Sequence, residues 1–105
     1  MKEITVQELN AKIENKEDIQ LIDVREPYEY DICNLDGKLI PVGNIFNEIE
    51  NISKDKPVII HCRSGARSAA VINELEKRHG FTNLYNLKGG ILAYAKEIDP
   101  SLSTY

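Results

Sequence analysis

The 105-residue sequence contains few residues of the kinds that define several common protein classes. It has only two cysteines and two histidines, and neither histidine lies near a second metal-ligand motif. A single cysteine pair would be an unusual disulfide framework for a domain of this length. We therefore expect Cys33 and Cys62 to be free thiols, with no metal site and no cofactor.

An excess of positive charge and a long apolar run are also absent. The net charge is −4, which argues against nucleic-acid binding and against a polybasic membrane-surface protein. No apolar stretch approaches the roughly 20 residues that span a bilayer, and the N-terminal MKEITVQELN lacks the apolar core of a signal peptide. We expect a cytoplasmic protein without nucleic-acid or membrane partners, either a complete small protein or a domain of a larger one.

Residues 1–105 are the right length for one domain, in which apolar runs of strand length alternate with helical patterns. Thr5 and Glu8 form a capping-box pattern before the first helix. The patterns predict helices at 6–15, 27–32, 44–52, 66–79 and 89–98, and strands at 19–24, 38–42, 58–62 and 83–87. This alternation is typical of an α/β fold with a parallel sheet covered by helices on both faces.

Cys62 ends the most hydrophobic of these runs, VIIHC, which we expect to be a central strand. In parallel sheets, ligands bind beyond the carboxyl ends of the strands. The segment CRSGAR, residues 62–67, is called the thiol loop below. It leads into a helix whose first N–H groups have no helical partner, and its small residues let these donors turn toward the sulfur. Such a cradle lowers the pKa of a thiol.

Two kinds of chemistry use such a cradle: phosphate-ester cleavage through a phosphocysteine and sulfur transfer through a cysteine persulfide. Cysteine phosphatases place an arginine six positions after the cysteine, where it grips the phosphoryl oxygens. Here that position is Ser68, and Arg67 comes one residue too early. The shorter loop fits one extra sulfur better than a phosphoryl group. Arg63 and Arg67 add positive potential that would attract an anionic donor.

The sequence resembles the rhodanese (sulfurtransferase) family. The resemblance rests on three stretches that cover most of the chain with the sequence between them: LIDVREPYEY at 21–30, VIIHCRSGARSAAV at 58–71 and NLYNLKGGILAYAKEIDPSL at 83–102. It implies a rhodanese-like fold with a central, mostly parallel sheet of about five strands. NLDGKLIPVGNI and the terminal AKEIDPSLSTY are similar to the rhodanese domain that follows adenylating enzymes of molybdopterin and thiamine synthesis.

The resemblance implies that Cys62 is the catalytic nucleophile, which takes sulfur from thiosulfate or a protein persulfide. Asp23 and Ser68 are expected to support the thiol loop, Asp23 through hydrogen bonds. The residues expected to bind the donor are those of the loop itself, namely Arg63, Ser64, Gly65, Ala66 and Arg67. A ubiquitin-like sulfur carrier is a possible partner. Two alternatives stay open: a sulfur-relay or binding module that acts only with protein partners, and a cysteine phosphatase or arsenate reductase.

Two further residues have more than one interpretation. Cys33 could be a resolving thiol that attacks a persulfide, but a partly buried small residue after a helix is the simpler interpretation. His61 falls within the predicted buried strand, where we expect a hydrogen-bonded core or near-surface imidazole.

Overall fold

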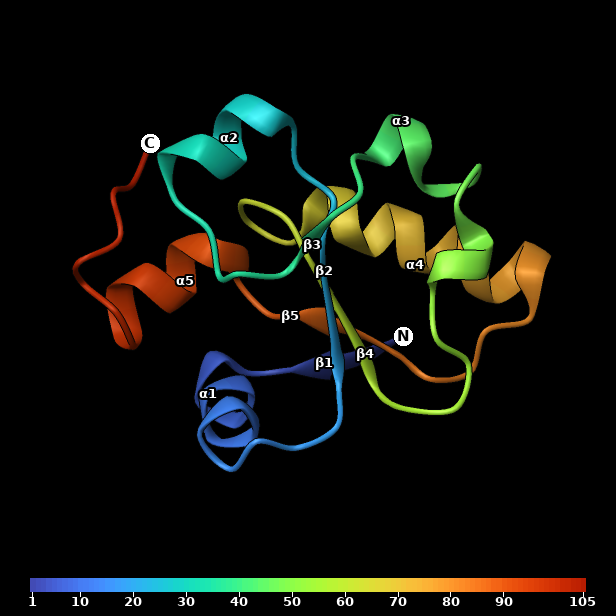
Figure 1. Ribbon diagram of the computed structural model, residues 1–105, viewed down its shortest axis with the longest axis horizontal. Helices are drawn as coiled ribbons and strands as arrows, with labels where there is room; N and C mark the ends of the chain where they lie inside the picture. The colour runs from blue at the N-terminus through green and yellow to red at the C-terminus, as the bar shows by residue number, and fades with distance from the viewer.

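The strands of the chain are separated by helices, as the sequence pattern predicts. In the computed structural model, which describes residues 1–105, the elements are β1 (Lys2–Ile4), α1 (Val6–Glu14), β2 (Gln20–Asp23), α2 (Pro27–Ile32), β3 (Lys38–Leu39), α3 (Val42–Ile45), the 3₁₀ helix η1 (Ile49–Asn51), β4 (Val58–His61), α4 (Ala66–His79), β5 (Leu84–Leu87) and α5 (Gly90–Glu97). Figure 1 shows their arrangement.

The five strands form one sheet in the order β1-β5-β4-β2-β3. Every neighbouring pair is parallel, which confirms the predicted α/β class. β4 is the middle strand, as its continuous apolar sequence predicts. Asp23 at the end of β2 pairs in register with His61 at the end of β4, so both strands end at the same edge of the sheet.

Helices cover both faces of the sheet, and two apolar cores lie between the layers. One core joins β2, β4 and β5 to α3 and α4, and the other joins β1, β4 and β5 to α1 and α5. Side chains of a strand point alternately to opposite faces. In and just after β4, Val58, Ile60 and Cys62 therefore belong to the first core and Ile59 to the second.

The segment between β2 and β4 differs from the sequence prediction. The predicted strand at 38–42 has only two residues, because Pro41 has no N–H for the sheet and instead precedes α3. The predicted helix at 44–52 is wrong as a single element. It is replaced by the short α3 and by η1, with backbone hydrogen bonds three residues apart such as Asn47 N to Asn44 O at 2.9 Å.

The strand β1 was not predicted from the sequence. It is three residues long, and only Ile4 of them is buried, so it shows no apolar pattern. Its place is set by pairing with β5 at the edge of the sheet.

Candidate active site

Cys62 directly follows β4 at the carboxyl edge of the sheet. It is only 1% exposed and packs in the core beneath α4. The rigid central strand fixes its backbone, and the helix α4 begins four residues later at Ala66. The sequence prediction that a buried strand delivers this cysteine to a strand–loop–helix junction is confirmed.

The thiol loop turns hydrogen-bond donors toward the Cys62 sulfur. Gly65 N donates to Cys62 Sγ at 3.1 Å, and Ser68 N lies 3.5 Å from the same atom. Gly65 has a φ of +108°, a conformation that side chains disfavour, and this turn brings its N–H inward. The N–H groups of Arg63, Ala66 and Arg67 donate to no acceptor within the chain. They remain available at the start of the helix.

The surroundings of Cys62 lower the pKa of its thiol. Burial by itself raises this pKa, since it disfavours the charged thiolate. Hydrogen bonds from the side chain and backbone of Ser68 and from the N–H groups of Gly65 and Ser64 act in the opposite direction and outweigh it. The site therefore favours a nucleophilic thiolate.

Ser68 is fully buried and touches the sulfur through its hydroxyl, with Ser68 Oγ 3.4 Å from Cys62 Sγ. The same hydroxyl donates to Asn86 Oδ1 at 2.6 Å, and Asn86 Nδ2 donates to Gly65 O at 3.1 Å. A hydroxyl has only one proton to donate. In the thiol form Cys62 can donate to Ser68, whereas a thiolate competes with Asn86 for the serine proton. Asn86 was not among the predicted site residues.

The first turn of α5 holds the beginning of the thiol loop. Ile91 N donates to Cys62 O at 3.0 Å, and Leu92 N donates to Arg63 O at 3.1 Å. This contact requires glycine at position 90, because a Cβ there would lie 2.4 Å from Arg63 O. The glycine pair in the sequence KGGI thus has a structural role in the site.

The two arginines of the thiol loop have different surroundings. Arg67 donates from Nη1 and Nη2 to the two carboxylate oxygens of Glu29, at 2.7 and 2.8 Å. Arg63 is exposed, donates to the backbone oxygen of Tyr105 and lies over the tyrosine ring, 5.0 Å from its centroid. Glu29 and Tyr105 are site residues that the sequence analysis missed.

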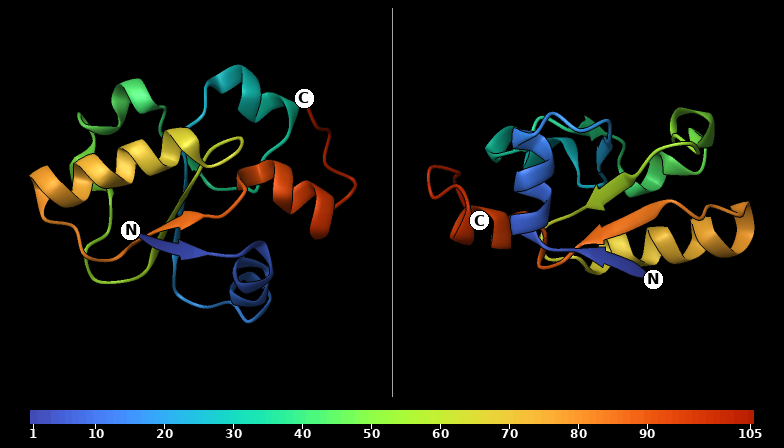
Figure 2. Two further views of the ribbon diagram at one scale, coloured as in Figure 1. Left: turned by 180° about the vertical axis from the view of Figure 1, so that it is seen from behind. Right: turned by 90° about the horizontal axis from the view of Figure 1, so that it is seen from below.

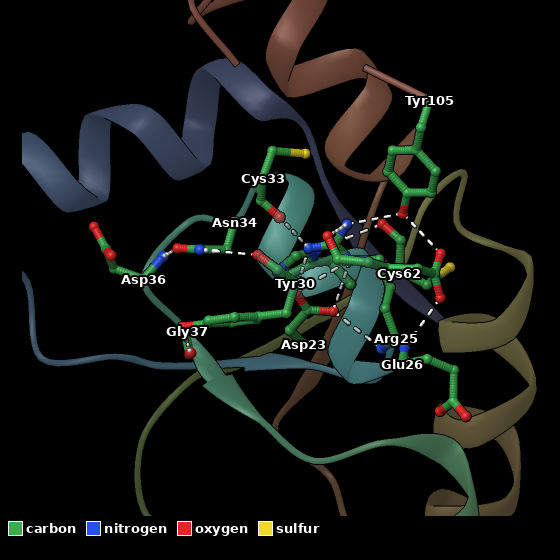
Figure 3. Close-up of polar contacts among 12 residues, drawn as sticks. Asp23, Arg25, Glu26, Tyr30, Cys33, Asn34, Asp36, Gly37, Cys62 and Tyr105 are labelled. Carbon is green, nitrogen blue, oxygen red and sulfur yellow. Dashed lines mark hydrogen bonds and ion pairs between the residues drawn. The ribbon is translucent and has the colours of Figure 1, made fainter. Parts of the chain in front are cut away.

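Asp23 lies at the end of β2, but its hydrogen bonds do not go to the thiol loop. Its carboxylate accepts from the backbone N, Nε and Nη2 of Arg25, at 2.8 to 3.1 Å. Arg25, which is fully buried, donates onward to Cys33 O and to the hydroxyl of Tyr105 (Figure 3). The tyrosine hydroxyl then donates to Glu29 at 2.7 Å. The link from Asp23 to the loop is therefore indirect.

The remaining polar residues give no sign of a second centre. His61 is fully buried, and burial lowers the pKa of its imidazole. Its Nε2 has no hydrogen-bond partner and lies 3.8 Å from Asp23 Oδ2. Cys33 is 8% exposed at the end of α2, and both cysteines are free thiols. No group of three or more ligand side chains could hold a metal ion. No helix is both long enough and apolar enough to cross a membrane.

These features define a parallel α/β protein in which backbone donors surround a cysteine whose thiol pKa is lowered. The family model described as "Rhodanese-like domain" matches residues 5–97, and the chain belongs to this family. Its relatives include the putative sulfurtransferase YtwF of Bacillus subtilis, 38% identical over 95% of this chain and 96% of that protein. Another is the probable adenylyltransferase/sulfurtransferase MoeZ of Mycobacterium tuberculosis, 34% identical over 97% of this chain.

The chain spans 26% of the length of MoeZ, so in that relative the matching region is one part of a larger protein. Among solved structures, a rhodanese-like domain protein from Staphylococcus aureus superimposes with a TM-score of 0.82 and 31% identity, covering 100% of this chain and 99% of that one. The comparisons support a sulfur-transfer family and confirm the rhodanese-like fold.

Proposed function

We propose that the chain is a sulfurtransferase that carries sulfane sulfur as a persulfide on Cys62. One observation supports this above all: Cys62 Sγ accepts hydrogen bonds from Gly65 N in the thiol loop and from Ser68 N just after it, in an environment that lowers the pKa of its thiol. A thiolate held in this way is a nucleophile near neutral pH.

In the first half-reaction the Cys62 thiolate attacks the outer sulfur of thiosulfate. A new S–S bond forms, the S–S bond of the donor breaks, and its electron pair leaves with sulfite. Total charge is conserved, since thiolate and thiosulfate become the persulfide anion and sulfite. The N–H groups of Arg63, Ala66 and Arg67 are free to stabilise the outer sulfur of the persulfide.

In the second half-reaction an acceptor removes the outer sulfur. A thiolate or cyanide attacks it, the S–S bond to Cys62 breaks, and the electron pair returns to the Cys62 sulfur as thiolate. Ser68, whose hydroxyl lies 3.4 Å from Cys62 Sγ, supports this leaving group. With a ubiquitin-like carrier whose carboxylate is activated as an acyl adenylate, the outer sulfur of the persulfide attacks the acyl carbon and AMP leaves. A thiolate from a second thiol then attacks Cys62 Sγ, the S–S bond breaks, and the carrier leaves as a thiocarboxylate while Cys62 and the thiol form a disulfide.

A sulfur-relay module that accepts sulfur only from a protein persulfide is the second candidate. The similarity to MoeZ favours it, because that relative joins adenylyltransferase and sulfurtransferase in its name. The phosphatase alternative has less support. The position where those enzymes need an arginine is Ser68, which is fully buried and bonded to Asn86.

The test is incubation with thiosulfate followed by mass spectrometry of the Cys62 peptide. We expect a mass increase of one sulfur atom in the native chain and in a Cys33→Ser control, and none in Cys62→Ala. Loading by a persulfidated cysteine desulfurase but not by thiosulfate would instead establish the relay module. Sulfur transfer that persists in Cys62→Ala would refute the proposal.

A further inference from the structure

The guanidinium of Arg67 forms an ion pair with Glu29 inside the protein. Its guanidinium and the Glu29 carboxylate face each other through two parallel hydrogen bonds of 2.7 and 2.8 Å. This paired geometry is the strong form of the arginine–carboxylate interaction. Glu29 is 3% exposed, whereas the side chain of Arg67 is 39% exposed, so the carboxylate is the buried partner of the pair and the guanidinium is the partner nearer the solvent.

The Glu29 carboxylate is fixed from other sides as well. The backbone N–H of Glu26 donates to its Oε1 at 3.0 Å, and the hydroxyl of Tyr105 donates to its Oε2 at 2.7 Å. Tyr105 reaches it because the C-terminal segment returns beside α2 (Figure 2). With four hydrogen bonds the carboxylate has little reason to move away. An anion that approaches Arg67 therefore meets a pair with no net charge.

Arg63 is the remaining cation of the thiol loop. It is exposed, so its attraction for an anion is screened by water. The side chains of Arg63, Arg67 and Glu29 together have a net charge of +1, whereas the two arginines alone would have +2. The charge on Glu29 therefore acts mainly on donors that carry several negative charges themselves.

We propose that Glu29 is a specificity-determining residue, which holds Arg67 away from the donor and so disfavours small free dianions relative to less charged sulfur donors. This inference rests on the proposed sulfur transfer and deepens it. A persulfide presented on a protein surface is the class of donor that such a site disfavours least, since its transferred group has at most one negative charge.

The test compares two donors that deliver the same kind of outer sulfur but differ in charge. Thiosulfate is a dianion that releases sulfite, and an aryl thiosulfonate is a monoanion that releases a sulfinate. Glu29→Gln removes the negative charge and preserves the side-chain length. The Coulomb energy of a donor beside Glu29 is proportional to the charge of that donor, and kcat/KM depends exponentially on this energy. The fold-change in kcat/KM for the dianion is therefore the square of the fold-change for the monoanion. We expect kcat/KM to rise about threefold for the thiosulfonate and about tenfold for thiosulfate.

The ratio of the two donors is the decisive quantity, because any change in the nucleophilicity of Cys62 affects both donors and cancels. Asp31→Asn is the matched control, since it removes the same charge from an exposed position of α2. We expect this control to leave the ratio unchanged. The double variant Glu29→Gln/Arg67→Gln keeps the pair neutral, so the ratio of kcat/KM for the two donors should return to within about twofold of the native ratio.

The outcomes separate this inference from the proposed function. If neither these donors nor a persulfidated cysteine desulfurase loads Cys62 in the native chain, the sulfur-transfer proposal fails and this inference fails with it. If both donors react but Glu29→Gln leaves their ratio unchanged, or the double variant keeps the raised ratio of Glu29→Gln, only the role of Glu29 is refuted. Should the variants unfold, NMR of the native chain decides: saturating sulfite should shift the Arg63 side-chain signal, and a shift of the Arg67 signal would overturn the inference.

Discussion

Replacing Gly90 by alanine tests how strictly the first turn of α5 supports the thiol loop. Gly90 has a φ of +62°, and an added Cβ would lie 2.4 Å from Arg63 O and 2.8 Å from Cys62 O. Both contacts are with backbone atoms, which cannot rotate away as a side chain could. The substitution should therefore displace the backbone of the nucleophile Cys62 and of the following residue, Arg63.

The loss of stability expected for Gly90→Ala is the sum of two separate contributions. The left-handed backbone conformation costs a residue with a Cβ roughly 1–2 kcal/mol, and overpacking a close contact adds about 1–3 kcal/mol. Gly80 provides the matched control, because it has a φ of +70° but a Cβ there would meet nothing within 4 Å. Gly80→Ala should show only the first cost. We expect Gly90→Ala to be less stable than Gly80→Ala by about 2 kcal/mol, which lowers Tm by about 10 °C more.

Urea unfolding gives the two free energies, and the rate of iodoacetamide reaction with Cys62 reports on the site in the folded protein. Gly80 lies at the far end of α4, so Gly80→Ala should react at the native rate. Gly90→Ala should react at a different rate, since the loop donors no longer meet the sulfur at their native distances. Equal stability of the two variants would refute the idea that α5 braces this loop.

Three other substitutions and conditions test the polar groups of the site. Ser68→Ala removes the side-chain donor to Cys62, so the pKa of that thiol should rise. A pH profile of thiol alkylation measures this pKa. An unchanged profile would contradict the role of Ser68. Glu29 has its pKa lowered from 4.5 to about 2, chiefly by the hydrogen bond from its arginine partner. Because the folded pKa is the lower one, this carboxylate stabilises the fold above pH 4.5, and the contribution is lost as the pH falls toward 2. We expect the free energy of unfolding to fall by about 2 kcal/mol over this pH range, a value reduced to allow for the exposure of the arginine. In urea unfolding, Glu29→Gln should abolish that part of the pH dependence. Tyr105→Phe removes a hydroxyl that joins Arg25 to Glu29, so it should cost about 1 kcal/mol in thermal unfolding, and no loss would show that the C-terminal contact adds nothing to stability.

The elements that could be predicted from the sequence are those whose own residues decide them. The helices at 27–32 and 66–79 occur with the predicted bounds, since Pro27 begins the first and Gly80, with its positive φ, ends the second. The prediction of a single helix at 44–52 was wrong because the residues of this segment do not by themselves decide between one helix and two short turns. Its isoleucines do enter the core, Ile45 fully and Ile49 in part, but that burial is satisfied by two short turns as well as by one helix.

The same distinction applies to the candidate site. Cys62 and its loop could be predicted because they are contiguous, and a cysteine between a buried strand and a helix has a local signature. Glu29, Asn86 and Tyr105 reach the site only through tertiary structure, from α2, β5 and the C-terminal segment. Asn86 left one weak signal, a polar residue within the apolar run NLYNL.

The position of Cys62 in the middle of the sheet explains why so many separate segments meet its loop. β5 lies on one side of β4 and contributes Asn86, which holds Gly65 O, while the turn after β5 lets α5 hold Arg63 O. β2 lies on the other side and leads into α2, which contributes Glu29 to hold Arg67. The loop is thus fixed near its start, middle and end by neighbours of the central strand. Because its donors are already oriented, little reorganisation is needed when negative charge moves onto the sulfur.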